Sequence, residues 1–166
     1  IITTDELFAG IDYQPLNLAT SMGRLNFYTT EELESNYLDF REIVVLQAVP
    51  NDIAVVSGII TEQFQTPLSH INVLSQNRGT PNMGLRGAFE SEEFRALEGK
   101  WVELTVGAFE YAIREVTQTE ADEWWESHKP EPLEPTPMDI SNTSIVDTHE
   151  LLDLDNQSLE EAIASN

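Results

Sequence analysis

The sequence predicts an α/β fold, and three patterns support this prediction. Residues 43–49 and 53–61 are two apolar runs with the length of buried strands. A helical pattern begins near His70, shortly after the second of these runs. Residues 101–106 and 109–116 then alternate apolar with polar side chains around a glycine, which is typical of a hairpin with one buried face. Strands that alternate with a helix in this way indicate an α/β architecture.

The remaining elements have weaker signals. Residues 12–27 contain a proline, a glycine and a short Leu-Asn-Leu alternation, which predicts a loop and a short strand. Residues 29–32 read Thr-Thr-Glu-Glu, as in a capping box, and predict a short helix to about Tyr37. Pro50-Asn51-Asp52 predicts a turn between the two apolar runs. Residues 91–97 have helical character, and a glycine follows them.

His70 is the candidate functional residue. If Ser69-His70 opens the helix, the imidazole lies beside unpaired backbone N–H groups and the positive end of the helix dipole. Gly79 and Pro81 predict the end of this helix and a return to an extended strand. Ligands gather where strands give way to helices in open α/β folds. These features predict that His70 accepts a phosphoryl group.

Four segments around this histidine occur in the order that a known family shares. They are Ile59-Ile60-Thr61-Glu62 as a strand into a loop, Ser69-His70, Gly79-Thr80-Pro81 as a strand re-entry, and residues 97–104 as a glycine followed by a strand. Residues 52–107 thereby resemble the phosphohistidine swivelling domain of the phosphoenolpyruvate synthase and pyruvate phosphate dikinase family. The motif of that family places Ser-His, or a near variant, after a Gly-Gly-x-Thr loop and before a Gly-x-Pro.

The resemblance implies both a fold and a function. The fold would be a swivelling β/β/α domain with a mixed sheet and few short helices over residues 1–116, with its core motif at 52–107. The function would be that of a phosphoryl carrier within an ATP-dependent phosphotransferase. A nucleotide-binding, ATP-grasp-like domain would use ATP and Mg²⁺ to phosphorylate His70, which would pass the group to pyruvate or another acceptor in an acceptor-substrate domain. The carrier domain alone would be inactive.

The motif departs from the family at several positions. Residues 64–67 replace the Gly-Gly, Leu68 stands where a threonine is usual, and Gln76 stands where an arginine is usual. Arg78, two residues later, is the expected substitute for that arginine. These changes suggest a divergent branch whose acceptor need not be pyruvate. The residues expected to support His70 are Ser69, Thr66 and Arg78.

The charge of the chain restricts its partners. It has 30 acidic and eight basic residues and a net charge of −22, with only two lysines. Nucleic acids and anionic membranes are therefore not expected as partners, because both bind clustered basic residues. Three of the six arginines lie in the segment just after the histidine, either as a surface compatible with phosphate or as solvated side chains. These three are Arg78, Arg86 and Arg95.

Cysteine content and hydropathy bear on location. The absence of cysteine excludes disulfides and thiolate metal sites and is consistent with a reducing cytoplasm, where we expect the protein to act. No segment is apolar for long enough to span a bilayer. The chain has neither a glycine-rich phosphate loop nor clustered acids suited to Mg²⁺, so we expect it to be part of a longer enzyme.

The composition changes after residue 116. Residues 117–137 combine acids with alternating prolines, which predicts an extended, semi-rigid linker. Residues 138–166 form an acidic tail or the start of a docking segment, in which 156–164 could be a short amphipathic helix. Trp124-Trp125 either packs on the core or binds a neighbouring domain.

Two other functions remain open. The domain could keep the swivelling fold as a non-catalytic binding or spacer module, as the changes in the motif would allow. A hydrolase would use His70 as a general base oriented by Asp52 or Glu62, but no nucleophile elbow or oxyanion motif accompanies these residues. His128 lies in the Pro-rich segment and His149 in the acidic tail, and both are expected to be exposed and without a catalytic role.

Overall fold

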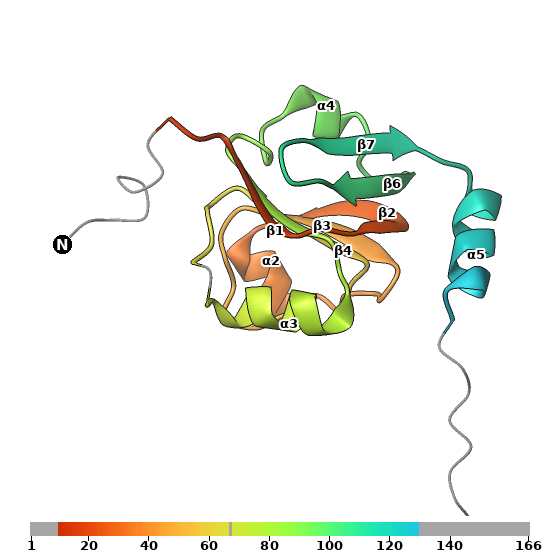
Figure 1. Ribbon diagram of the computed structural model, residues 1–166, viewed down its shortest axis with the longest axis horizontal. Coiled ribbons are helices and arrows are strands. Elements are labelled where there is room, and N and C mark those ends of the chain that lie inside the picture. The colour runs from red at the N-terminus through yellow and green to blue at the C-terminus, as the bar shows by residue number, and fades with distance from the viewer. Residues whose placement is uncertain (1–9, 67, 130–166) are drawn as a thin grey trace, which may run out of the picture. The chain divides into compact units, whose positions relative to one another are not determined.

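The computed structural model describes residues 10–66 and 68–129 (Figure 1). The rest of the expected linker, from residue 130, and the expected tail at 138–166 lie outside the described residues. No helix within the described residues has the length and apolar composition needed to cross a membrane. The elements in chain order are β1 (Tyr13–Asn17), β2 (Thr20–Tyr28), α2 (Thr30–Ser35), β3 (Glu42–Leu46), β4 (Gly58–Thr61), α3 (His70–Arg78), β5 (Asn82–Leu85), α4 (Glu92–Arg95), β6 (Trp101–Val106), β7 (Tyr111–Glu115) and α5 (Gln118–Ser127).

The strands of the described residues form one mixed sheet in the order β1-β5-β4-β3-β2-β6-β7. The four central strands, β5, β4, β3 and β2, are parallel to one another. Strand β1 pairs antiparallel with β5 at one end of the sheet, and β6 and β7 continue it antiparallel at the other. The sheet curls so that its two ends meet: the hydroxyl of Tyr13 in β1 donates to the carbonyl of Gly107, in the turn between β6 and β7, at 2.6 Å. The prediction of an α/β fold with a mixed sheet and few short helices is confirmed.

Apolar side chains cover both faces of the central strands. In β3, Ile43 and Val45 pack into one core, whereas Val44 and Leu46 pack into the other. Successive side chains of a strand point to opposite faces, so a strand buried on both faces is a continuous apolar run. Figure 1 shows α4 on one side of the strands and α2 and α3 on the other. Phe94 of α4 joins the first core, and Ile71 of α3 joins the second.

The predicted helix signals act as expected. Thr29 and Glu32 form the capping box that starts α2, and the hydrogen bonds from Thr29 hold the pKa of Glu32 below its usual value. The helix ends at Ser35, slightly before the expected Tyr37. Gly79 ends α3 with a φ of +66°, in the left-handed region that glycine adopts without strain.

Two predicted strands differ from the observed ones. The apolar run at 53–61 becomes strand β4 only from Gly58, because Ile53 and Val56 instead pack from a loop against the core beneath α3. Residues 12–27 hold two strands rather than a loop and one short strand. The second of them, β2, lies between β3 and β6 in the sheet. Its polar residues interrupt the apolar pattern, so the sequence does not indicate a central strand here.

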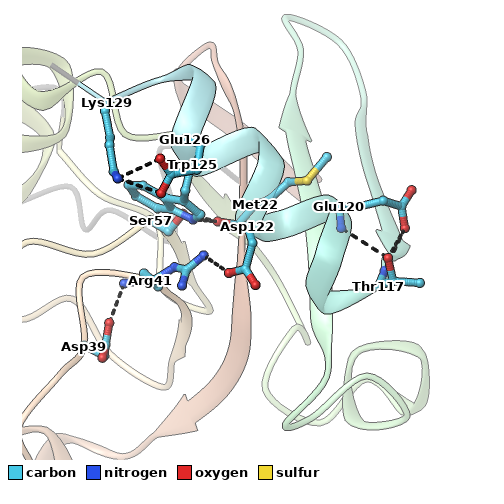
Figure 2. Close-up of polar contacts among 10 residues, drawn as sticks. All are labelled: Met22, Asp39, Arg41, Ser57, Thr117, Glu120, Asp122, Trp125, Glu126 and Lys129. Carbon is cyan, nitrogen blue, oxygen red and sulfur yellow. Dashed lines mark hydrogen bonds and ion pairs between the residues drawn. The ribbon is translucent and has the colours of Figure 1, made fainter. Parts of the chain in front are cut away.

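The expected linker at 117–137 begins as a helix instead. Thr117 and Glu120 form a capping box that starts α5, and Ala121 on this helix is fully buried (Figure 2). Trp125 then donates from its indole Nε1 to the carbonyl of Met22 in β2 at 2.9 Å. The folded unit therefore extends to residue 129 rather than 116, because this helix has an apolar face to bury.

Arg41 fastens α5 to the sheet. Its guanidinium lies 5.2 Å from the ring centroid of Trp101 and 5.8 Å from that of Trp125, and it pairs with Asp122 (Figure 2). Cation–π contacts and an ion pair thus meet on one side chain. Phe40 adds an edge-to-face contact with Trp125. Of the two outcomes open for the tryptophan pair, packing on the core is the one observed.

Replacing Trp125 by alanine tests the attachment of α5. The change removes the bond to Met22 and the ring contacts with Arg41 and Phe40, so we expect a loss of about 2 kcal/mol in the free energy of unfolding. Urea denaturation measures this loss. Phe109→Ala is the matched control, because that side chain is 95% exposed, and its effect should stay within about 0.5 kcal/mol. Equal stability of the Trp125 variant and the wild type would contradict the attachment.

The stability of the fold should fall at high pH through Tyr28. Burial raises the pKa of Tyr28 to about 12, together with the neighbouring Glu42, whose carboxylate accepts a hydrogen bond from the Tyr28 hydroxyl. The unfolded chain loses this proton first, so the stabilisation is complete below a pH of about 10 and is lost as the pH rises through about 12. In Tyr28→Phe, urea midpoints should decline less steeply over this range, whereas Tyr37→Phe, a change to an exposed ring, should follow the wild-type curve.

Candidate functional site

The candidate site lies where the chain passes from β4 into α3. Ser69 is the N-cap of α3: its hydroxyl accepts from the backbone N–H of Asn72, and its carbonyl accepts from the same group at 3.0 Å. His70 is the first residue of the helix. The first N–H groups of a helix have no acceptor within it, so the amides of His70 and Ile71 face this end. The expected placement of His70 at a helix start is therefore observed.

The imidazole of His70 is open to solvent. Its side chain is 64% exposed, and its Nε2 lies 3.9 Å from Oδ1 of Asp52, which is itself 80% exposed. This separation is too long for a hydrogen bond but allows electrostatic attraction when the imidazole is protonated. The same Asp52 oxygen accepts from the backbone N–H of Ile53 at 2.8 Å. The carboxylate is thus oriented by its own loop and faces the histidine.

The structure brings only part of the expected support to His70. The carbonyl of Thr66 accepts from the N–H of Ser69 at 2.9 Å, in the turn that leads into the helix. Arg78 lies in the last turn of α3, about 12 Å along the helix axis from His70 at 1.5 Å per residue. Its guanidinium donates to the carbonyls of Ile53 and Ala54 at 3.3 and 3.4 Å. Thr66 and Ser69 are therefore local to the histidine, whereas Arg78 is not.

Arg86 and Arg95, the other two arginines expected near a phosphate, also have structural contacts. Arg86 donates to the carbonyl of Ile11 and lies 4.7 Å above the ring of Phe64. Arg95 donates to the carbonyl of Phe89 and lies 3.8 Å above the ring of Phe27. Glu62, the second acid considered as a partner of the imidazole, accepts from the backbone N–H of Phe89. Of the two acids considered, it is Asp52 that faces His70.

The chain segment that contains His70 has no acidic residue and is partly apolar. Residues 63–78 hold no acidic residue in a chain with 30 of them. Leu68, two residues before the histidine, is 89% exposed, and Val73, one turn after it, is also exposed. A hollow of about 320 Å³ includes Asp52 in its wall. Its lining residues are Thr30, Leu33, Val49, Pro50, Asn51 and Asp52.

Sequence reasoning missed a group of buried amides beneath this site. Gln65 and Asn82 are 1% and 0% exposed, and Gln14 is also buried. The sequence positions of two of them could have revealed the group. Gln65 lies in the loop before the histidine, and Asn82 lies in the strand that follows the helix of the histidine. Amide side chains at such places are candidates for satisfying loop backbone groups.

The N-cap predicts the cost of losing Ser69. Ser69→Ala removes the hydroxyl that accepts from Asn72, so the free energy of unfolding should fall by about 1 kcal/mol, whereas Ser69→Asp should keep most of it. Urea denaturation of both variants measures the difference. If alanine and aspartate gave the same stability, the hydroxyl would have no capping role.

Comparisons with known proteins do not identify the site, so its geometry is the evidence for its role. Searches against models of protein families and against curated proteins find no match to the chain. The family resemblance therefore rests on the four quoted segments, and Ser69-His70 with the Gly79-x-Pro81 spacing are the two of them that lie at the candidate site. In the structure, these residues form the start and the end of one short helix in an α/β fold with a mixed sheet.

Proposed function

We propose that this chain is the phosphoryl-carrier domain of an ATP-dependent enzyme similar to phosphoenolpyruvate synthase and pyruvate phosphate dikinase. One observation carries the proposal: the imidazole of His70 is 64% exposed at the first residue of α3. A carrier must present its nucleophile to two separate active sites, so the ring has to be reachable from outside. An exposed histidine at a helix start meets this need, and the amides at that end favour a bound phosphoryl group.

The chemistry is a pair of phosphoryl transfers. A neutral nitrogen of His70 attacks a phosphorus atom of the nucleotide, a P–N bond forms, and the P–O bond to the rest of the nucleotide breaks. The acceptor oxygen then attacks the same phosphorus, and the P–N bond breaks. The carboxylate of Asp52, 3.9 Å from Nε2, would repel the phosphoryl group and so favour its onward transfer.

The nucleotide and its metal belong to another domain in this proposal. The described residues contain no group of three or more His, Cys, Asp or Glu side chains arranged to hold a metal, and we assign the Mg²⁺ to the donor domain. Arg78 is at the far end of α3 and is bonded to backbone carbonyls. The cations that phosphoryl transfer requires would come from the ATP-grasp-like donor domain and from the acceptor domain. A cytoplasmic enzyme, with its supply of ATP, is the setting we propose.

A second candidate is a non-catalytic swivelling module that serves as a binding or spacer domain. It is favoured by the motif itself, where residues 64–67 replace the Gly-Gly and Gln76 replaces an arginine. Phe64, one of these replacing residues, is buried. In this case His70 would be a surface histidine beside an apolar docking residue, Leu68.

The phosphate on His70 separates the two candidates. When the whole enzyme is given ATP and Mg²⁺, we expect an acid-labile, base-stable phosphate on His70, detected by mass spectrometry at neutral pH. His70→Ala should remove all of it and all turnover. His128→Ala is the matched control, because that exposed residue ends α5, away from the helix that His70 starts, and it should leave incorporation unchanged. Full incorporation and turnover without the His70 imidazole would exclude the carrier function.

A further inference from the structure

The loop between β4 and α3 is held by side-chain amides rather than by a strand. The backbone N–H of Gln65 donates to Oε1 of Gln14, and Nε2 of Gln14 donates to the carbonyl of Gln65, each at 2.8 Å. These are the two bonds that a neighbouring strand would otherwise make with the residue. Gln14 belongs to β1. One edge strand thus fixes a loop position five residues before His70.

The side chain of Gln65 continues this network into the core. Its Nε2 donates to Oδ1 of Asn82 at 2.8 Å, and Nδ2 of Asn82 donates back to Oε1 of Gln65 at 3.1 Å. Nδ2 of Asn82 also donates to the hydroxyl of Ser75 in α3 at 3.1 Å, and this hydroxyl donates to the carbonyl of Asn72. Asn82 therefore connects the loop before the histidine with the middle of the helix that the histidine starts.

The strand under the loop is shaped to allow this contact. A Cβ atom at Gly84 of β5 would lie 2.9 Å from the ring of Phe64 and 3.1 Å from Oε1 of Gln14. Both distances are tighter than ordinary packing, so a larger residue at this position would require Phe64 or Gln14 to shift. At the other end of α3, Asn17 of β1 donates to the carbonyls of Ser75 and Thr80.

Stability alone does not account for a polar network of this kind. Replacing both partners of a buried hydrogen bond by apolar groups of the same shape is often nearly neutral for stability. Hydrogen bonds differ from apolar contacts in that they fix distance and direction, so a fully satisfied network specifies one arrangement. The arrangement specified is that of the loop and the first two turns of α3, and therefore of the imidazole at its start.

We propose that Gln65 and Asn82 are positioning residues for His70. This inference rests on the proposed function, because in-line attack on phosphorus requires the nucleophile to be placed closely, and a small misplacement costs a large factor in rate. The amide pair holds the start of α3 so that the same nitrogen reaches the nucleotide and the acceptor in the same orientation. Neither residue touches the reacting atoms.

The test variant replaces both amides by apolar side chains of similar size, Gln65→Met with Asn82→Leu. In the whole enzyme, the rate of phosphate incorporation into His70 at saturating ATP should fall at least about tenfold. The ATP concentration for half-maximal rate should not change, because the nucleotide is bound elsewhere. The reaction of His70 with diethyl pyrocarbonate, which needs no positioning, should also keep its wild-type rate.

Hydrogen exchange gives a readout that does not depend on phosphoryl transfer. In the 166-residue chain, the hydrogen-bonded amides of Ser69, Asn72 and Val73 should exchange at least about tenfold faster in the double variant, with cooperative unfolding retained. Gln63→Met with Asn77→Leu is the matched control, because it makes the same chemical changes at exposed positions. It should alter neither exchange nor phosphate incorporation. Ser75→Ala, a milder change in the same network, serves if the double variant does not fold.

The outcomes separate the inference from the function on which it rests. If wild-type His70 takes up phosphate and the double variant does so at the same rate, the positioning inference is overturned and the carrier function stands. If wild-type His70 takes up none, the carrier function is wrong and hydrogen exchange decides the role of the network. Equal exchange in the wild type and the variant overturns that role, and faster exchange confined to the amides of Ser69, Asn72 and Val73 supports it.

Discussion

Two hydrogen bonds between the side-chain amide of Gln14 and the backbone of Gln65 constrain the part of the molecule that bears the candidate site. The chain has to leave β4, cross the end of the sheet and start a helix, and it is buried on the way at Phe64 and Gln65. Buried backbone groups need partners. The edge strand β1 supplies them through the side chain of Gln14, and Gln65 in turn bonds to Asn82, which reaches Ser75 of α3.

Local signals were sufficient to predict the helix of His70. Ser69 caps it, Gly79 ends it in a left-handed conformation, and the strand after Pro81 begins within two residues of the expected place. Each of these signals acts over a few neighbouring residues, so a single sequence contains them. The continuous apolar run of β3 was equally clear, because a strand buried on both faces has no polar positions to interrupt it.

Features that depend on distant partners were not predictable in the same way. Strand β2 contains Ser21, Arg24 and Asn26, and only its pairing with β3 and β6 makes it central. Helix α5 was hidden by acids and by the prolines beyond it, although Thr117, Glu120 and the apolar spacing of Ala121 and Trp125 were visible in the sequence. The prediction that Arg78 supports His70 did not allow for the length of the helix, because the two residues are eight positions apart on α3.

All three tryptophans of the chain lie at the attachment of α5. Trp101 belongs to the strand beneath the helix, and Trp124 and Trp125 belong to the helix itself. The intrinsic fluorescence of the protein is therefore a natural reporter of whether this helix is seated, with the guanidinium of Arg41 against two of the three indoles. A change in that emission would therefore report on the contact between α5 and the sheet.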